Sequence, residues 1–90
     1  MSPVVFRHRG FAFKFYANEG NPREPVHIHV VKDGRDLKLW LWPEVGVAYN
    51  DGIDERTVRE LVNIVRDRRR EIDDAWRDFF GDADQHSVRG

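Results

Sequence analysis

Residues 27–40, HIHVVKDGRDLKLW, predict a β-hairpin that turns at Asp33-Gly34. A two-residue type I′ turn requires positive φ at both central positions, which aspartate and glycine tolerate well. Pairing the strands around this turn places Ile28 opposite Leu39 and His29 opposite Lys38. Because side chains alternate between the faces of a strand, one face collects only aliphatic residues: Val26, Ile28, Val30, Leu37, Leu39 and Leu41.

The opposite face of this hairpin carries the chemically active side chains. Because the aliphatic face supplies the core, we expect His27 and His29 to lie outside the main core, on an open face of the sheet. Their neighbours on that face are Val31, Asp36, Lys38, Trp40 and Trp42.

A second hairpin is predicted upstream, with strands at residues 4–8 and 11–16 joined near Arg9-Gly10. This turn would place Phe6 opposite Phe13 and Val4 opposite Phe15. Residues 17–25 contain asparagine, glycine and two prolines without periodicity, which indicates a loop. Alternation over residues 45–49 predicts a short edge strand before the next turn.

Beyond Ile53 the apolar residues recur at helical spacing. Asp54 is a suitable N-cap and Gly81 a suitable C-terminal residue after the helix. The apolar stripe thins between Arg66 and Glu71, where a kink or a second helix is possible. We favour one helix of about 26 residues that covers the aliphatic sheet face. The predicted fold is a single α+β domain over residues 1–81: an antiparallel sheet of four or five strands, built from two successive hairpins and covered on one face by a long C-terminal helix. Residues 82–90 are expected to form a flexible tail.

The composition narrows the class of protein. The chain has 90 residues, of which 40% are hydrophobic and 34% charged, and its net charge is −1. It contains no cysteine, which excludes disulfides, thiolate zinc sites and cysteine nucleophiles. No apolar run is long enough for a membrane span and no signal peptide is evident, so we expect a cytoplasmic protein without membrane contact. The near-neutral charge gives no general indication of nucleic-acid binding.

The predicted open face combines cations with aromatic rings. Such a surface can bind single-stranded RNA through stacking and phosphate contacts. It can also form a protein interface, which we favour: we expect a homo-oligomer, such as a dimer, or a complex with a small protein encoded by an adjacent gene. The sequence leaves both alternatives open. The candidate nucleic-acid or partner-binding residues are Lys14, Tyr16, Asn18, Lys38, Trp40 and Trp42.

His27 and His29 point the same way because they are two residues apart on one strand. Imidazoles can bind a metal, with Glu19 or Glu24 as a further ligand, although Lys38 nearby would oppose a cation. Alternatively, Glu19 orients a histidine that acts as a general acid or base. The third alternative is that both are ordinary strand histidines that make hydrogen bonds. The sequence identifies no particular cofactor.

Four segments carry a family resemblance: FYANEGN at residues 15–21, EPVHIHV at 24–30, WLWP at 40–43 and AWRDFFG at 75–81. Together they resemble the DUF4160 family of small bacterial proteins of unknown function, over nearly the whole chain. Arg23 and Val26 depart from its pattern. The family motif falls on Tyr16, Asn18, Glu19, Pro25, His27 and His29.

The resemblance implies a function in a pair of small proteins. Members of this family are often encoded beside a second small protein and have been proposed to form type II toxin–antitoxin pairs, without a settled activity. We therefore expect a bacterial cytoplasmic protein of a toxin–antitoxin-like module that acts through the sheet face bearing His27 and His29. The alternatives are a non-catalytic interaction module, such as an antitoxin or structural partner, and a histidine-dependent RNA-cleaving or metal-binding protein.

Overall fold

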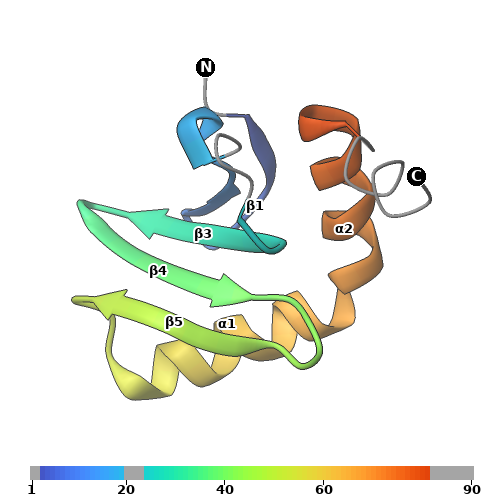
Figure 1. Cartoon of the computed structure of the whole chain (residues 1–90). Helices are drawn as coiled ribbons and strands as arrows, with labels where there is room; N and C mark the ends of the chain where they lie inside the picture. The colour runs from blue at the N-terminus through green and yellow to red at the C-terminus, as the bar shows by residue number, and fades with distance from the viewer. Residues whose placement is uncertain (1–2, 20–23, 82–90) are drawn as a thin grey trace.

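The computed structural model describes residues 3–19 and 24–81. Five antiparallel strands form one sheet in the order of the chain, β1 to β5, and two helices follow (Figure 1). This confirms the predicted α+β class. The elements are β1 (Val4–His8), β2 (Phe11–Lys14), the 3₁₀ helix η1 (Ala17–Glu19), β3 (His27–Lys32), β4 (Arg35–Trp40), β5 (Gly46–Asp51), α1 (Glu55–Asp67) and α2 (Arg69–Phe80).

The β3–β4 hairpin has the predicted register. Ile28 pairs with Leu39 and His29 with Lys38. The turn residues Asp33 and Gly34 have φ values of 51° and 80°, the left-handed conformation that a type I′ turn requires. The aliphatic alternation and the turn chemistry therefore specified the same pairing.

The β1–β2 hairpin follows the prediction at one end only. Phe6 pairs with Phe13, and their rings stack with centroids 4.3 Å apart. Val4, however, pairs with Lys14 and not with Phe15, because an irregularity between Val4 and Phe6 shifts the register. The predicted pairing of Val4 with Phe15 is therefore wrong.

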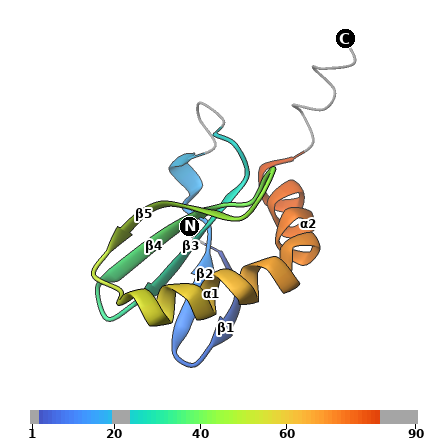
Figure 2. The same cartoon turned by 90° about the horizontal axis from the view of Figure 1, so that it is seen from below.

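The helical segment is divided in two, so the favoured single helix is wrong and the alternative of a second helix beginning within residues 66–71 is correct. Helix α1 ends at Asp67, and Arg68, with φ −111° and ψ 21°, separates it from α2. The break lies where the apolar stripe is interrupted by charged residues. Figure 2 shows that α1 crosses one side of the sheet while α2 turns away beside its end.

The core lies between the sheet and the helices. From α1, Leu61 and Val65 pack in the cluster that contains Leu37 and Leu39 of the sheet. From α2, the Trp76 ring packs edge-on against Phe15, with centroids 5.3 Å apart. The predicted tail, residues 82–90, lies outside the described residues. Within residues 3–19 and 24–81, no helix is long and apolar enough to cross a membrane.

Candidate metal centre

His27 and His29 are buried, with 0% and 1% of their surface exposed. The expectation that they lie outside the core on an open face is therefore wrong. They do lie opposite the aliphatic face of the hairpin, since the register pairs His27 with Trp40 and His29 with Lys38. Aromatic rings close around them: Tyr16 is 4.2 Å from His29, and Trp76 of α2 is 5.0 Å from His27, measured between centroids.

The 3₁₀ helix η1 brings Glu19 onto the two imidazoles. Its turn is closed by a hydrogen bond from the Glu19 backbone N–H to the Tyr16 carbonyl. The carboxylate oxygen Oε1 of Glu19 lies 2.6 Å from His27 Nε2 and 2.8 Å from His29 Nε2. Three ligand atoms, one from each residue, all lie within 4.8 Å of one another. The structure thus unites the three residues that the sequence selected as candidate catalytic residues.

The other ring nitrogen of each histidine already has an oxygen partner. His27 Nδ1 lies 2.8 Å from the Pro25 carbonyl, which can only accept, so this nitrogen carries the proton. His29 Nδ1 lies 3.1 Å from Asp36 Oδ1, and the Tyr49 hydroxyl donates to the second oxygen of Asp36 at 2.9 Å. A backbone carbonyl or carboxylate that holds Nδ1–H is the usual outer partner of a metal-binding histidine. Both Nε2 atoms are consequently left to face Glu19.

Burial and hydrogen bonding set the protonation of the neighbouring groups. Burial raises the pKa of Glu19, but its contacts with His27 and His29 lower it by more, and the net pKa lies below the ordinary value. Glu19 is therefore ionised at neutral pH. Burial, and then the hydrogen bond to Asp36, raise the pKa of the Tyr49 hydroxyl. Tyr49 therefore remains a hydrogen-bond donor to Asp36.

Lys38 is closer to carboxylates than the sequence implied. Its Nζ lies 2.7 Å from Glu24 Oε1 and 3.7 Å from Glu19 Oε2. If both imidazoles are neutral, the cluster contains the carboxylates of Glu19, Glu24 and Asp36 and one ammonium, that of Lys38. Its net charge is then −2. Lys38 therefore does not exclude a cation, because its charge is already matched by Glu24.

The other residues that were predicted to bind nucleic acid or a partner do not form one continuous surface. Lys14 and Trp40 are half-buried beside the cluster; Lys14 Nζ lies over the Tyr16 ring and Lys38 Nζ over the Trp40 ring. Asn18 is exposed on η1. Trp42 does not lie on the histidine face as predicted: its Nε1–H donates to Asp73 of α2 at 3.1 Å.

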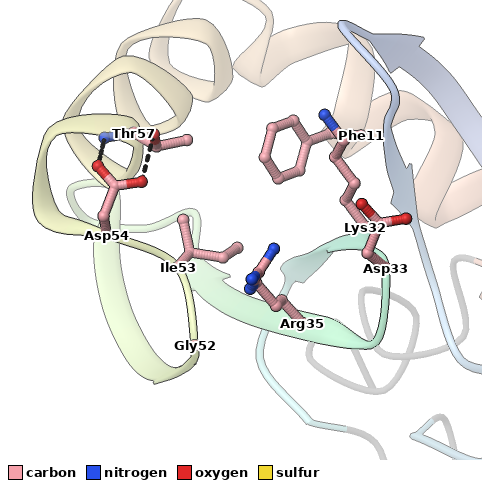
Figure 3. A pocket seen from close by; sticks show the side chains of 8 residues that line it. All are labelled: Phe11, Lys32, Asp33, Arg35, Gly52, Ile53, Asp54 and Thr57. Carbon is pink, nitrogen blue, oxygen red and sulfur yellow. Dashed lines mark hydrogen bonds between the residues drawn. The ribbon is translucent and has the colours of Figure 1, made fainter.

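A hollow of about 400 Å³ lies away from these histidines, beside the β3–β4 turn (Figure 3). The side chains of Arg35 and Phe11 border it, and Asp54 borders it at the start of α1. Both Asp54 oxygens are occupied, since they accept hydrogen bonds from Thr57. This hollow contains none of the residues of the histidine cluster.

Sequence reasoning missed the outer partners of the cluster. The hairpin register placed Asp36 on the same face as His29, but the sequence assigned no role to its carboxylate. Tyr49 lies in a segment whose pattern was ambiguous, and Trp76 comes from a helix 49 positions beyond His27 along the chain. Nothing in the sequence near the histidines indicates either contact.

Residues 10–77 match the family model described as "Domain of unknown function (DUF4160)". The chain belongs to this family, since the match spans well over half of its length. The matched segment contains the complete cluster of Glu19, His27 and His29. No curated protein and no solved structure matches the chain.

Proposed function

We propose that the protein binds a divalent transition-metal ion through His27 Nε2, His29 Nε2 and a carboxylate oxygen of Glu19. The observation that carries this proposal is the orientation of the two rings. Each Nδ1 is held by an oxygen outside the cluster, so both Nε2 atoms converge on one carboxylate oxygen. A cation bound by both lone pairs and the carboxylate would complete this arrangement.

Electrostatics favours a metal over protons at this position. Without a metal, each Nε2 can donate to Glu19 only if its ring is an imidazolium, since Nδ1 already carries a proton. Two imidazolium rings with centroids 5.3 Å apart would place like charges in a buried site, which is unfavourable. One divalent ion supplies the same two positive charges without this repulsion.

The donor set narrows the choice of metal. Two imidazoles and one carboxylate suit zinc, nickel, copper or iron(II) better than magnesium or calcium, which prefer oxygen ligands. Metal–ligand bonds of about 2.1 Å put tetrahedral ligands about 3.4 Å apart, so Glu19 has to retreat by less than about 1 Å from its present contacts. Glu19 keeps 16% of its side chain exposed, and a water ligand would complete the coordination on that side.

Calorimetric titration of the metal-free protein with zinc and nickel tests this function. We expect one ion per chain in the wild-type protein and no such binding after His27→Gln with His29→Gln. His8→Gln is the matched control, because His8 is a partly exposed histidine whose nearby carboxylate is Glu60. Equal binding by the double variant and the wild-type protein would contradict the proposal.

A toxin–antitoxin-like module in the bacterial cytoplasm is the cellular setting that we propose, and the family resemblance supports it. Growth arrest on expression, relieved by the product of the neighbouring gene, would support the toxin role. We expect the double histidine variant to lose the arrest while His8→Gln retains it. Histidine-dependent RNA cleavage fits the cluster less well, because both rings are buried and cannot contact an RNA phosphate directly.

An interaction module is the second candidate function. It is supported by large hydrophobic side chains that remain exposed on the described surface, among them Trp42 at 46% and Val47 at 49%. Binding to the product of the neighbouring gene without growth arrest would favour the antitoxin or structural role. A metal centre is compatible with this alternative, since metal binding can also stabilise a fold.

A further inference from the structure

Strand β5 is an edge of the sheet, paired with β4 on one side only. Charged residues, proline and β-bulges commonly protect edge strands from further pairing; β5 has one bulge, in its pairing with β4, and no proline. Over Gly46–Asp51 the only charged residue is Asp51, at the very end. The hydrophobic side chains of Val47 and Tyr49 are 49% and 44% exposed. This edge is therefore open to an additional strand.

A β-bulge directs the side chains of β5 to two different faces. Leu39 pairs with Val47 and Lys38 with Tyr49, which leaves Ala48 as the extra residue. Tyr49 consequently joins the polar side, where it donates to Asp36. Val47 instead lies on the helix side, where it lines a groove together with residues of α1.

The groove runs between β5 and α1, since residues of both elements line it. Its volume is about 380 Å³. Three valines supply its apolar wall and no acidic residue lines it among the described residues. Arg66 donates to the neutral side chain of Asn63 at 3.2 Å. The groove is lined by Val47, Val58, Arg59, Val62, Asn63 and Arg66.

We propose that β5 and this groove bind an extended segment of a partner protein as a sixth strand, with apolar side chains alternating with carboxylates. Main-chain pairing would provide affinity, and alternate side chains would enter the apolar groove, as in strand addition generally. Arg59 and Arg66 have no carboxylate along the groove, so an acidic segment supplies the missing charge. A second copy of this chain fits less well, because β5–β5 pairing would bring two arginine-lined grooves together.

The proposal is independent of the metal centre. The groove contains none of Glu19, His27 or His29, and it lies on the helix side of the sheet. Failure of metal binding would therefore leave it untouched, and failure of strand addition would leave the metal proposal untouched.

A designed peptide tests the proposed strand addition. The probe is a capped seven-residue peptide in which valine and glutamate alternate, and its matched control has lysine in place of glutamate. We expect amide chemical-shift changes confined to β5 and α1, with the glutamate peptide binding at least tenfold more tightly. Added salt should weaken the binding, because exposed charges are screened.

Variants locate the interaction. Arg59→Gln with Arg66→Gln should weaken the glutamate peptide about tenfold, whereas Arg56→Gln, an exposed arginine of α1 outside the groove, should not. Val47→Asp should abolish binding, and unchanged spectra elsewhere would show that it still folds. No shifts at millimolar peptide, or equal affinity for both peptides, would overturn the proposal. Concentration-dependent dimerisation that Val47→Asp abolishes would assign the edge to a second copy instead.

Discussion

On the helix side of the β3–β4 hairpin, Ile28 and Leu39 are packed by apolar residues, whereas on the other side His27 and His29 are packed by polar and aromatic ones. All four side chains are buried to 1% exposure or less. The aliphatic side needs only volume and contact, because burial of apolar surface is favourable in itself. The histidine side is tolerated only because every ring nitrogen has an oxygen partner. Equal burial thus rests on two different physical requirements.

The largest expected effect lies on the aliphatic side. Leu39→Ala removes a fully buried side chain, and we expect the free energy of unfolding to fall by about 2–5 kcal/mol. Urea denaturation measures this loss. Val47→Ala on the exposed edge is the control and should change stability by less than about 0.5 kcal/mol. A loss below about 1 kcal/mol for Leu39→Ala would show that the helix side is loosely packed.

The second prediction concerns the histidine side in the metal-free protein. Glu19→Ala removes the one oxygen that both buried Nε2 atoms contact, which should cost about 1–3 kcal/mol. Glu19→Gln retains an acceptor oxygen and should cost less, while still losing metal binding. Urea denaturation in the presence of a chelator measures both. If Glu19→Ala is as stable as the exposed control Glu44→Ala, the imidazoles do not depend on this carboxylate.

The third prediction tests whether Asp36, which contacts His29 but is not a proposed metal ligand, contributes to metal affinity. Asp36→Asn can still accept the Nδ1–H of His29 but lacks the negative charge, so zinc affinity should fall about 10–100-fold. Competition with a coloured chelator measures the affinity. Asp51→Asn is the matched control, because Asp51 is exposed and pairs with Asp36 across the sheet. Equal affinities for the two variants would mean that Asp36 has no part in holding the ligand.

The two faces of the β3–β4 hairpin differ in how far the sequence predicts them. The β3–β4 register was predictable because turn chemistry and aliphatic alternation are local and agree. Burial of the opposite face was not predictable from the sequence. Alternation shows which residues share a face, but it does not show which other residues cover that face. The histidines are covered by Glu19 of η1 and by Trp76 of α2. Helix α2 follows the last strand of the sheet, so Trp76 is far from the histidines in sequence.

The break between α1 and α2 and the position of Trp42 also differ from the prediction, because both depend on contacts between residues far apart in the sequence. The charged stretch around Arg68 weakened the helical pattern, but the break itself depends on α1 and α2 packing against different parts of the sheet. Trp42 was assigned to the histidine face by extending the strand alternation past Trp40. The strand ends there, and Trp42 turns to α2, where Arg69 lies over its ring and Asp73 accepts its N–H.

The smallest expected effect concerns a carboxylate on the surface of the protein. Asp54 caps α1 by accepting hydrogen bonds from the Thr57 hydroxyl and backbone N–H, and these bonds hold its pKa below the ordinary value of 3.8. Asp54→Ala should lower the melting temperature at neutral pH by a few degrees, whereas Asp54→Asn, which can still cap, should lower it less. Asp74→Ala, at an exposed position within α2, is the control.

The pH dependence of this cap has a defined sign. Because the pKa of Asp54 is lower in the folded protein than in the unfolded chain, its contribution is complete above the unfolded value of 3.8 and is lost as pH falls through the folded pKa. The difference in melting temperature between wild-type protein and Asp54→Ala should therefore narrow only in strong acid, and calorimetry across that range measures it. A gap that stays constant through acid would mean that the neutral carboxyl caps equally well. Unlike Glu19, which holds two buried rings, Asp54 would then contribute through shape alone.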